Sequence, residues 1–400
     1  MNETNNKSIL EESIRKYETP FYLFDTDRLT KKIQSIKSIL GPEPEICYAM
    51  KANPFLIKSL EDNVNYFEVC SPGEFNICER SGINMNQVVL SGVYKKPEDL
   101  EYAITTYENR IIYTVESLAH WQSLSAYTKK HKISIRVLLR MTSGNQFGMD
   151  ESLIRKLISE NPYDYITIEG IQYFSGTQKK SAKKLEQELI MLNQFCEDLK
   201  QDYGFTVQKL EYGPGLFVNY FKDDTIEEND LLKALSLALK HLTFGGRVTL
   251  EMGRFLVACC GYYVTTVVDT KTNKNQNYCI VDGGIHHMNY YGQMLAMKKP
   301  PIIHPEEEKE EQEEKEGKKE WTVCGSLCTA SDVLIRQYPF YGLKSGDHLI
   351  FEKTGAYSVT EGISLFLSRQ LPQIILYSSA SGFTIARPIT DTDPINYFKP

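Results

Sequence analysis

The sequence predicts an α/β protein in which a (β/α)8 TIM barrel precedes an antiparallel β domain of barrel or sandwich type. Over roughly the first 260 residues, eight short apolar runs alternate with segments of 3.6-residue periodicity. After about residue 259, apolar positions recur with period two and helical patterns become rare. An open doubly wound sheet is the alternative for the first part, but eight strand–helix units are the number that closes a parallel sheet.

The barrel elements follow in chain order. Apolar runs predict eight strands, which read EICYAM (45–50), YFEVC (66–70), VVLSG (88–92), RIIYTVE (110–116), ISIRVLLRM (133–141), YITIEGIQYF (165–174), KLEYG (209–213) and RVTLEMG (247–253). Apolar stripes predict helices between them, the clearest being PEDLEYAITTY (97–107), LAHWQSLSAYTKKH (118–131), AKKLEQELIMLNQFCEDL (182–199) and ENDLLKALSLALKHL (228–242).

The second domain is predicted from period-two alternation. Its strand-like segments are YYVTTVVDTKTN (262–273), QNYCIVDGG (276–284), EWTVCGSLC (320–328), DHLIFEKTGAYS (347–358) and QIILYSSASGFTIARPI (373–389). A further run, PFYLFD (20–25), lies ahead of the barrel. We therefore expect a cofactor-binding barrel over residues 26–258 and a β domain built from residues 1–25 and 259–400.

Composition limits the classes of function. The chain of 400 residues is 42% hydrophobic and 24% charged, as in a globular protein with a full core. Its net charge of −7 argues against a nucleic-acid partner, because phosphates need a basic surplus. No apolar stretch approaches the ~20 residues of a membrane span, and the polar N-terminus is unlike a secretory signal. We expect a cytoplasmic protein with neither a nucleic-acid nor a membrane partner.

The cysteines and one charged segment further limit the function. Nine cysteines scattered without a framework spacing are typical of free thiols in a reducing compartment. Cys324 and Cys328 are four apart, but no second Cys or His pair at zinc spacing accompanies them, so no metal site is expected. Residues 304–320 are almost purely charged, which predicts an exposed flexible insertion; partner binding is the alternative.

Polar groups stand where each predicted strand ends, and chemistry in barrels of this kind collects at those ends. Lys51 follows the first strand, the turn FSGTQ (174–178) follows the sixth, and Gly213–Gly215 follows the seventh. Glu251 and Arg254 close the eighth. A lone lysine is more often a solvated surface group, but polar residues at every strand end are hard to ascribe to packing.

These groups suit an aldehyde that carries a phosphate. Lys51 can form a Schiff base with a carbonyl, and a turn with glycines at 213 and 215 lets the main chain approach a phosphate. Arg254 can add a bidentate phosphate contact. Glu251 can hold a proton on a pyridine nitrogen, as pyridoxal 5'-phosphate requires. An ion pair between Glu251 and Arg254 is the structural alternative, and it stays open at this point.

Motifs along nearly the whole chain resemble those of the fold-type III pyridoxal-phosphate decarboxylases, the ornithine and diaminopimelate decarboxylase family, whose fold is alanine racemase-like. The lysine motif is YAMKANP (48–54). The others, in the family's order, are VCSPGE (69–74), FGMD (147–150), FSGTQ (174–178), GPGL (213–216), EMGR (251–254), VDGG (281–284), CGSLCTASD (324–332) and GAY (355–357). Each is weak alone, but the ordered set is specific.

The resemblance implies a role for each matching residue. Lys51 would carry the cofactor, Glu251 would pair with its pyridine nitrogen and Phe174 would stack on its ring. The residues expected around the phosphate are Thr177, Gly213, Gly215, Arg254 and Tyr357. Cys328, delivered from the neighbouring subunit of a homodimer, would protonate the carbanion after carbon dioxide leaves, although the residues alone favour a small buried hydrophobe there. Asp332 would lie near the substrate.

The departures from the family pattern bear on the substrate. Phe174 stands where most members have a histidine, and Pro214 interrupts a triple glycine. Thr329 replaces the acid that usually meets a substrate amine. No arginine follows VDGG to hold a distal carboxylate, and His286 and His287 stand there instead, with His286 a candidate substrate contact.

These changes resemble a subgroup that decarboxylates carrier-bound or conjugated amino acids in siderophore and natural-product biosynthesis, so an acyl-carrier protein is a possible partner. A decarboxylase of free diaminopimelate, ornithine or lysine is the alternative. An amino-acid racemase is a weaker alternative, since it needs an opposed base where this chain has the Cys328 motif. A non-enzymatic cofactor carrier would be a single barrel, whereas this sequence predicts a second domain.

Overall fold

The computed structural model describes residues 3–160, 164–290, 296–307 and 317–399, which fall into two compact units. Unit 1 comprises Met1–Lys31, Asn219–Thr225 and Val257–Pro400, and unit 2 comprises Lys32–Val218 and Ile226–Leu256. The short piece Asn219–Thr225 therefore groups with unit 1, although it lies between two barrel strands in the sequence. Within the described residues, no helix combines the length and the apolar character that crossing a bilayer requires.

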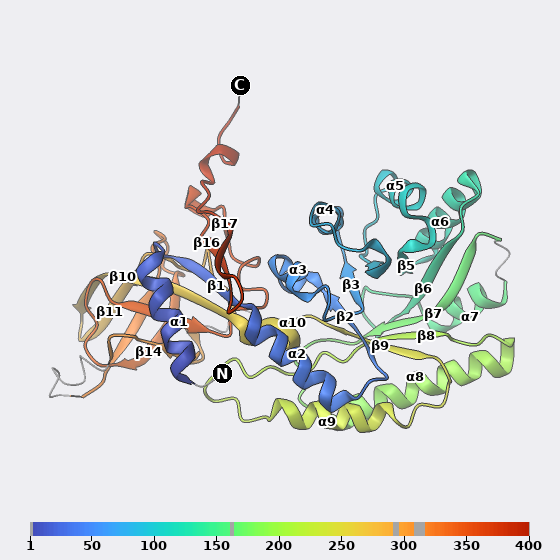
Figure 1. Cartoon of the computed structure of the whole chain (residues 1–400), viewed down its shortest axis with the longest axis horizontal. Coiled ribbons are helices and arrows are strands. Elements are labelled where there is room, and N and C mark those ends of the chain that lie inside the picture. The colour runs from blue at the N-terminus through green and yellow to red at the C-terminus, as the bar shows by residue number, and fades with distance from the viewer. Residues whose placement is uncertain (1–2, 161–163, 291–295, 308–316, 400) are drawn as a thin grey trace. The chain divides into compact units, whose positions relative to one another are not determined.

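Unit 2 is a closed barrel of eight parallel strands, which confirms the predicted fold class (Figure 1). The strands are β2 (Glu45–Ala49), β3 (Tyr66–Val69), β4 (Val88–Leu90), β5 (Ile112–Val115), β6 (Ile135–Met141), β7 (Ile166–Phe174), β8 (Lys209–Gly213) and β9 (Arg247–Met252). Pairing of β2 with β9 closes the sheet. Most strand residues are buried, because a barrel strand faces a filled interior on one side and helices on the other.

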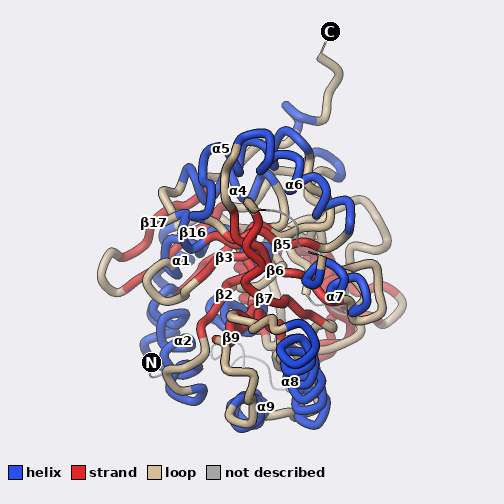
Figure 2. Tube along the Cα trace, turned by 90° about the vertical axis from the view of Figure 1, so that its right-hand side faces the viewer, coloured by secondary structure: helices blue, strands red, loops and turns tan. Residues whose placement is uncertain are grey.

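Helices surround the strands, as Figure 2 shows for α4 to α9. They are α2 (Thr26–Leu40), α3 (Ile57–Leu60), α4 (Pro72–Arg80), α5 (Pro97–Tyr107), α6 (Leu118–His131), α7 (Glu151–Ser159), α8 (Ala182–Tyr203), α9 (Glu228–Leu239) and α10 (Arg254–Val257). Ser71, Ser117 and Ser181 begin α4, α6 and α8 by accepting a hydrogen bond from the amide three residues on. Gly204, in the left-handed region, ends α8.

Unit 1 contains a nine-stranded sheet and the helix α1 (Glu3–Lys16). Its strands are β1 (Phe21–Asp25), β10 (Gly261–Asn273), β11 (Gln276–Val281), β12 (Ile302–Ile303), β13 (Lys319–Cys324), β14 (Val333–Phe340), β15 (His348–Glu352), β16 (Gln373–Ser378) and β17 (Gly382–Arg387). Ile9 and Leu10 of α1 pack on a core that includes Phe21, Val264 and Ile350. The predicted β domain is therefore present.

Several details of unit 1 differ from the sequence prediction. The sheet is mixed rather than wholly antiparallel, because β1 pairs with β16 and β11 with β13 in parallel. No hairpin joins the strands of either pair, so chain continuity does not impose an antiparallel direction. Neither α1 nor β14 was predicted. Two ends of the predicted flexible segment 304–320 are ordered, since His304 is buried and β13 begins at Lys319, while 308–316 lie outside the described residues.

Candidate active site

Lys51 lies in a short 3₁₀ turn, Met50–Ala52, at the C-terminal end of β2. Its Nζ is 2.9 Å from Glu68 Oε2 and 3.7 Å from Glu251 Oε1. The strand pairing assembles this group, because β3 sets Glu68 beside Ala49 and β9 sets Glu251 beside Cys47, one on each side of β2. The Lys51 side chain is 43% exposed, whereas those of Glu68 and Glu251 are 2% and 8% exposed. An accessible amine thus stands over two buried carboxylates.

The two carboxylates are held in opposite protonation states. Burial tends to raise the pKa of Glu68, but the Lys51 ammonium and hydrogen bonds from Lys51 and Glu251 outweigh it and lower that pKa. Burial, followed by the negative charge of Glu68, raises the pKa of Glu251. Glu68 is therefore the anion that pairs with Lys51, and Glu251 is the acid that keeps its proton. The sequence left Arg254 as an alternative partner of Glu251. In the structure, Lys51 is a cationic neighbour of Glu251, at 3.7 Å.

A third carboxylate inside the barrel was not predicted as a site residue. Glu211 of β8 is fully buried, and its Oε1 accepts a hydrogen bond of 2.6 Å from Gln172 Nε2. Burial raises the pKa of Glu211 to about 7. The available signal was the period of two in KLEYG, which turns Glu211 toward the same interior as the neighbouring strands' polar residues.

The turns after β7 and β8 form a close backbone cradle. Gly215 has a φ of +56°, and a Cβ added there would lie 1.9 Å from the carbonyl oxygen of Gly176. Lys179 N donates a hydrogen bond of 2.8 Å to Gly215 O, which joins the two turns. Only glycine permits this approach of the two turns, and glycine turns of this kind can present main-chain amides to an anion.

The remaining predicted barrel residues lie around this cradle. Phe174 ends β7 opposite Gly213 of β8, and a Cβ on Gly213 would lie 2.4 Å from Phe174 Cδ2, so the glycine makes room for the ring. Thr177 is an exposed residue of the turn after β7. Arg254, partly exposed, begins α10 directly after β9. The structure therefore gathers the predicted barrel residues at the C-terminal ends of β2, β7, β8 and β9.

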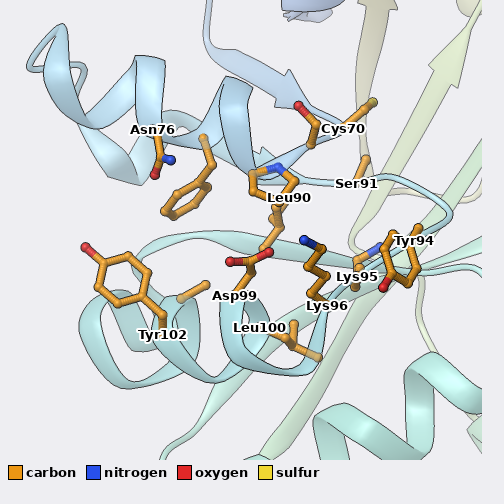
Figure 3. A pocket seen from close by; sticks show the side chains of 14 residues that line it. Cys70, Asn76, Leu90, Ser91, Tyr94, Lys95, Lys96, Asp99, Leu100 and Tyr102 are labelled. Atoms are coloured by element: carbon orange, nitrogen blue, oxygen red, sulfur yellow. The ribbon is translucent and has the colours of Figure 1, made fainter. Parts of the chain in front are cut away.

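A small pocket adjoins Lys51 between α4 and α5 (Figure 3). It encloses about 50 Å³ and includes Cys70, whose Sγ is 3.8 Å from Lys51 Nζ. Lys95, on the loop after β4, donates to the carbonyl of Gly92 at 2.6 Å, and burial lowers the pKa of Lys95 to about 8. The pocket holds a few waters at most. Neither Cys70 nor Lys95 was predicted as a site residue: Cys70 lies in the VCSPGE motif without an assigned role, and Lys95 stands among ordinary loop residues.

The other predicted site residues belong to unit 1. Cys328 is an exposed thiol, and Thr329 Oγ1 lies 3.0 Å from Ser331 Oγ. Tyr357 has a φ of +65°, a backbone state that a residue with a side chain seldom adopts and that often marks functional sites. These placements leave the predicted roles of Cys328, Thr329 and Tyr357 as predictions.

The Asp332 carboxylate accepts hydrogen bonds from two backbone amides. It is 2% exposed, Oδ1 accepts from Ile285 N at 2.9 Å, and Oδ2 accepts from Leu327 N at 2.8 Å. Cβ atoms on Gly284 and Gly325 would lie within 3 Å of its oxygens, so both glycines make space for the carboxylate. Asp332 therefore fastens the Cys328 loop to the VDGG turn, and its contacts are those of a positioning residue.

The two histidines after VDGG are also built into unit 1. His286 is 1% exposed, and burial lowers its pKa to about 3. His287 contacts the Tyr263 hydroxyl at 3.1 Å and the Gln370 carbonyl at 2.7 Å, and burial lowers its pKa to about 4. Both imidazoles are neutral at physiological pH, so neither offers the positive charge that an arginine would supply there.

Comparisons with known proteins agree with this arrangement. The family model described as "Pyridoxal-dependent decarboxylase, pyridoxal binding domain" matches residues 26–258. The L-glutamyl-[BtrI acyl-carrier protein] decarboxylase of Niallia circulans is 27% identical, over 95% of this chain and 93% of that protein. The 2-[(L-alanin-3-ylcarbamoyl)methyl]-2-hydroxybutanedioate decarboxylase of Staphylococcus aureus is 26% identical, over 88% and 93%. The crystal structure of diaminopimelate decarboxylase from M. jannaschii has the same fold, with a TM-score of 0.84 at 22% identity, over 97% of this chain and 94% of that one.

Proposed function

The chain belongs to the family of pyridoxal-dependent decarboxylases, and from that premise we propose that it decarboxylates an amino acid held as a side-chain conjugate or on a carrier protein. The coarser activity follows from the family: the chain is an amino-acid decarboxylase that uses pyridoxal 5'-phosphate. The proposal concerns the substrate, the roles of individual residues and the assembly of the site.

The barrel residues fit the cofactor. Lys51 offers an accessible amine for its aldehyde, and Glu251 offers a buried acid for its pyridine nitrogen. The cradle of Gly176 and Gly215, with Gly213, Thr177 and Arg254 of the same unit, would hold its phosphate, and the family resemblance alone adds Tyr357 to this set. When bound, pyridoxal phosphate supplies an electron sink for the electron pair that carbon dioxide leaves behind.

The chain's own residues would control protons. Glu251, whose pKa is raised, keeps the proton that the pyridine nitrogen shares. Glu68, whose pKa is lowered, stays anionic and holds the Lys51 ammonium at 2.9 Å. Cys328, an exposed thiol, would return a proton to the carbon that loses carbon dioxide.

One observation carries the substrate proposal: of the three polar groups near the missing anchors, Asp332 and His287 already have hydrogen-bond partners in unit 1, and His286 is uncharged. Asp332 accepts two backbone hydrogen bonds, and His287 contacts Tyr263 and Gln370. His286 is buried and neutral. Among these described residues, Thr329 stands where an acid would meet a free side-chain amine, and an unpaired buried charge costs several kcal/mol.

A conjugated side chain avoids that cost. A neutral amide or thioester can meet the Thr329 hydroxyl with an ordinary hydrogen bond. The two relatives named above point the same way, since one acts on a glutamyl group on an acyl-carrier protein and the other on an alanine joined through a carbamoyl group. This chemistry suits siderophore or natural-product biosynthesis, with an acyl-carrier protein as one partner. A decarboxylase of free diaminopimelate, ornithine or lysine is the competing proposal.

Steady-state kinetics decide between them. We expect carbon dioxide release from an ω-amide or pantetheine-thioester conjugate of a dicarboxylic amino acid, with kcat/KM at least tenfold above that for the free diamino acids. Thr329→Asp should raise kcat/KM for the free diamino acids, because it restores a carboxylate for the distal amine, while Thr329→Ser should not. A kcat/KM of ~10⁴ M⁻¹s⁻¹ or more on any free diamino acid would overturn the substrate proposal.

The same premise supports a homodimer in which each site combines Lys51 of one chain with Cys328 of the other. Lys51 lies in unit 2 and Cys328 is an exposed residue of unit 1, so the two proposed catalytic groups are carried by different units of the chain. Because the Cys328 thiol is exposed on unit 1, it is available to a second copy of the chain.

A further inference from the structure

Unit 1 gathers a histidine and two carboxylates that the proposed reaction does not use, and we propose that His304, Glu306 and Asp347 bind a divalent transition-metal ion. His304 and Glu306 follow directly after β12, and Asp347 directly precedes β15. The pairing of β12 with β15, which sets Ile303 opposite Ile350, brings the two stretches together.

The ligand atoms have the spacing that a shared ion requires. His304 Nε2 is 3.7 Å from Glu306 Oε2 and 3.7 Å from Asp347 Oδ2, and one ligand atom from each residue lies within 4.8 Å of the others. Ligand atoms bound about 2.1 Å from one tetrahedral ion stand roughly 3.4 Å apart, by simple geometry from the usual bond lengths. The two distances from His304 Nε2 are therefore already close to this spacing, and the two carboxylates lie within 4.8 Å of each other, so side-chain adjustment alone can close the site.

Burial makes a cation favourable here. The His304 and Asp347 side chains are 1% and 4% exposed, and that of Glu306 is 28% exposed. Two carboxylates held this close repel each other, and partial burial strengthens the repulsion. A divalent ion offsets both charges, while the exposed edge of Glu306 leaves an open position for water.

Both carboxylates are already oriented by neighbouring groups. Glu306 Oε1 is 3.0 Å from His348 Nδ1, and Glu306 Oε2 accepts from His348 N at 3.2 Å. Asp347 Oδ2 accepts from Lys344 N at 2.7 Å. Hydrogen bonds of this kind fix metal-binding side chains and tune their affinity. The carboxylates are therefore held toward His304 before any ion arrives.

The donor set selects the kind of ion. One imidazole with two carboxylates suits Zn²⁺ or Mn²⁺, whereas Ca²⁺ and Mg²⁺ prefer oxygen ligands alone. Such an ion would tie the first residues of the acidic segment 304–320 to β15, which gives Glu306 a structural role. The competing explanation is that His304 and the two carboxylates contact only one another, and that arrangement needs no ion.

The test measures metal binding and thermal stability of the full-length holoenzyme after chelation. Titration calorimetry with Zn²⁺ and with Mn²⁺ should show one site per chain above any thiol background, and the ion should raise the melting temperature. Ca²⁺ should bind at least tenfold more weakly. A single site with equal affinity for Ca²⁺ would overturn the choice of ion.

Variants separate the site from adventitious binding. Glu306→Gln and Asp347→Asn should weaken that site more than tenfold, and His348→Gln should weaken it 10–100-fold, as the loss of an orienting partner does. Glu307→Gln is the matched control, because Glu307 instead pairs with Lys318 at 2.5 Å and should leave binding unchanged. Equal binding in Glu306→Gln and Glu307→Gln, or no site at micromolar Zn²⁺ and Mn²⁺, would refute the proposal.

Discussion

At the scale of single residues, Lys51 combines an accessible amine with two buried carboxylates. Lys51→Ala should abolish turnover and remove the yellow colour of the bound cofactor, because no other group at this position can hold the aldehyde. The fold should survive, since a side chain 43% exposed adds little to the core. Visible absorption, activity and thermal melting measure the three effects.

Borohydride fixation gives an independent check on Lys51. Reduction of the holoenzyme should attach the cofactor to one peptide, and that peptide should contain Lys51. Lys58→Ala is a suitable control, because Lys58 is 55% exposed on neighbouring α3 and should label and turn over as the parent protein does. Label on a peptide without Lys51 would contradict the site as described.

Glu211 supplies a pH-dependent prediction. Its pKa is raised from 4.5 to about 7 by burial, so the folded state holds its proton more tightly than the unfolded state. The stability it contributes is present below pH ~4.5 and is lost as pH rises through ~7. Glu211→Gln keeps an acceptor for Gln172 but cannot ionise. Between pH 5 and pH 8, the free energy of unfolding of the variant should therefore rise relative to that of the parent protein by on the order of 1–3 kcal/mol.

Urea unfolding of the cofactor-free protein at several pH values measures this difference. Glu186→Gln, on an exposed position of α8, is the control and should change little with pH. The difference in unfolding free energy between Glu211→Gln and the parent protein should change from pH 5 to pH 8. If it stays constant, Glu211 is ionised throughout and its pKa is not raised.

Sequence reasoning located single residues well where a strand end marked them. Lys51 and Arg254 follow barrel strands and Glu251 lies near the end of one, so the fold class alone sets all three at one end of the sheet. The backbone contacts of Asp332 could not be predicted, because its two hydrogen bonds depend on the three-dimensional approach of Ile285 and Leu327. No local sequence pattern encodes that approach. The expected place of Asp332 near the substrate stays a prediction.

At the scale of elements, the turns after β7 and β8 depend on Gly215. Gly215→Ala should weaken cofactor binding at least tenfold and lower the melting temperature, because the new Cβ would collide with Gly176 O and push the two turns apart. Cofactor titration of the apoprotein measures the first effect. Gly204→Ala is the matched control: Gly204 has a φ of +64° but nothing within 4 Å of the added Cβ.

The control isolates the collision from backbone strain. Both substitutions place alanine in the left-handed region at a cost of roughly 1–2 kcal/mol, so both should lose some stability. Only Gly215→Ala should also lose cofactor affinity. Equal cofactor affinity in the two variants would mean that the cradle does not hold the phosphate.

Elements of the barrel were predictable for a physical reason. Parallel strands buried on both faces give apolar runs, and amphipathic helices between them give clear periodicity, so all eight strands and the four predicted helices are present. The strand pairing of unit 1 is harder to predict from the sequence, since the parallel pairing of β1 with β16 joins distant parts of the chain. The proposed metal ligands His304 and Asp347 are separated in the same way, and no ligand spacing in the sequence reveals them.

At the scale of the whole molecule, the proposed homodimer shares its sites. Lys51→Ala and Cys328→Ala proteins should each be nearly inactive, and mixing them should restore activity through heterodimers. In such a heterodimer, one site receives both altered residues and the other receives neither. Random exchange at equal concentrations makes half the dimers mixed, each with one intact site, so about a quarter of the parent activity should return.

A second mixture shows whether recovery arises from sharing. Lys51→Ala and Glu251→Gln both alter the barrel unit, so every site in their heterodimer carries one defect and activity should not return. Subunit exchange must first be shown with two differently tagged chains. Sites confined to one chain would leave both mixtures inactive after exchange, and a monomer in solution would exclude sharing altogether. Recovery with the Cys328→Ala partner alone would place the thiol and the lysine of one site on different chains.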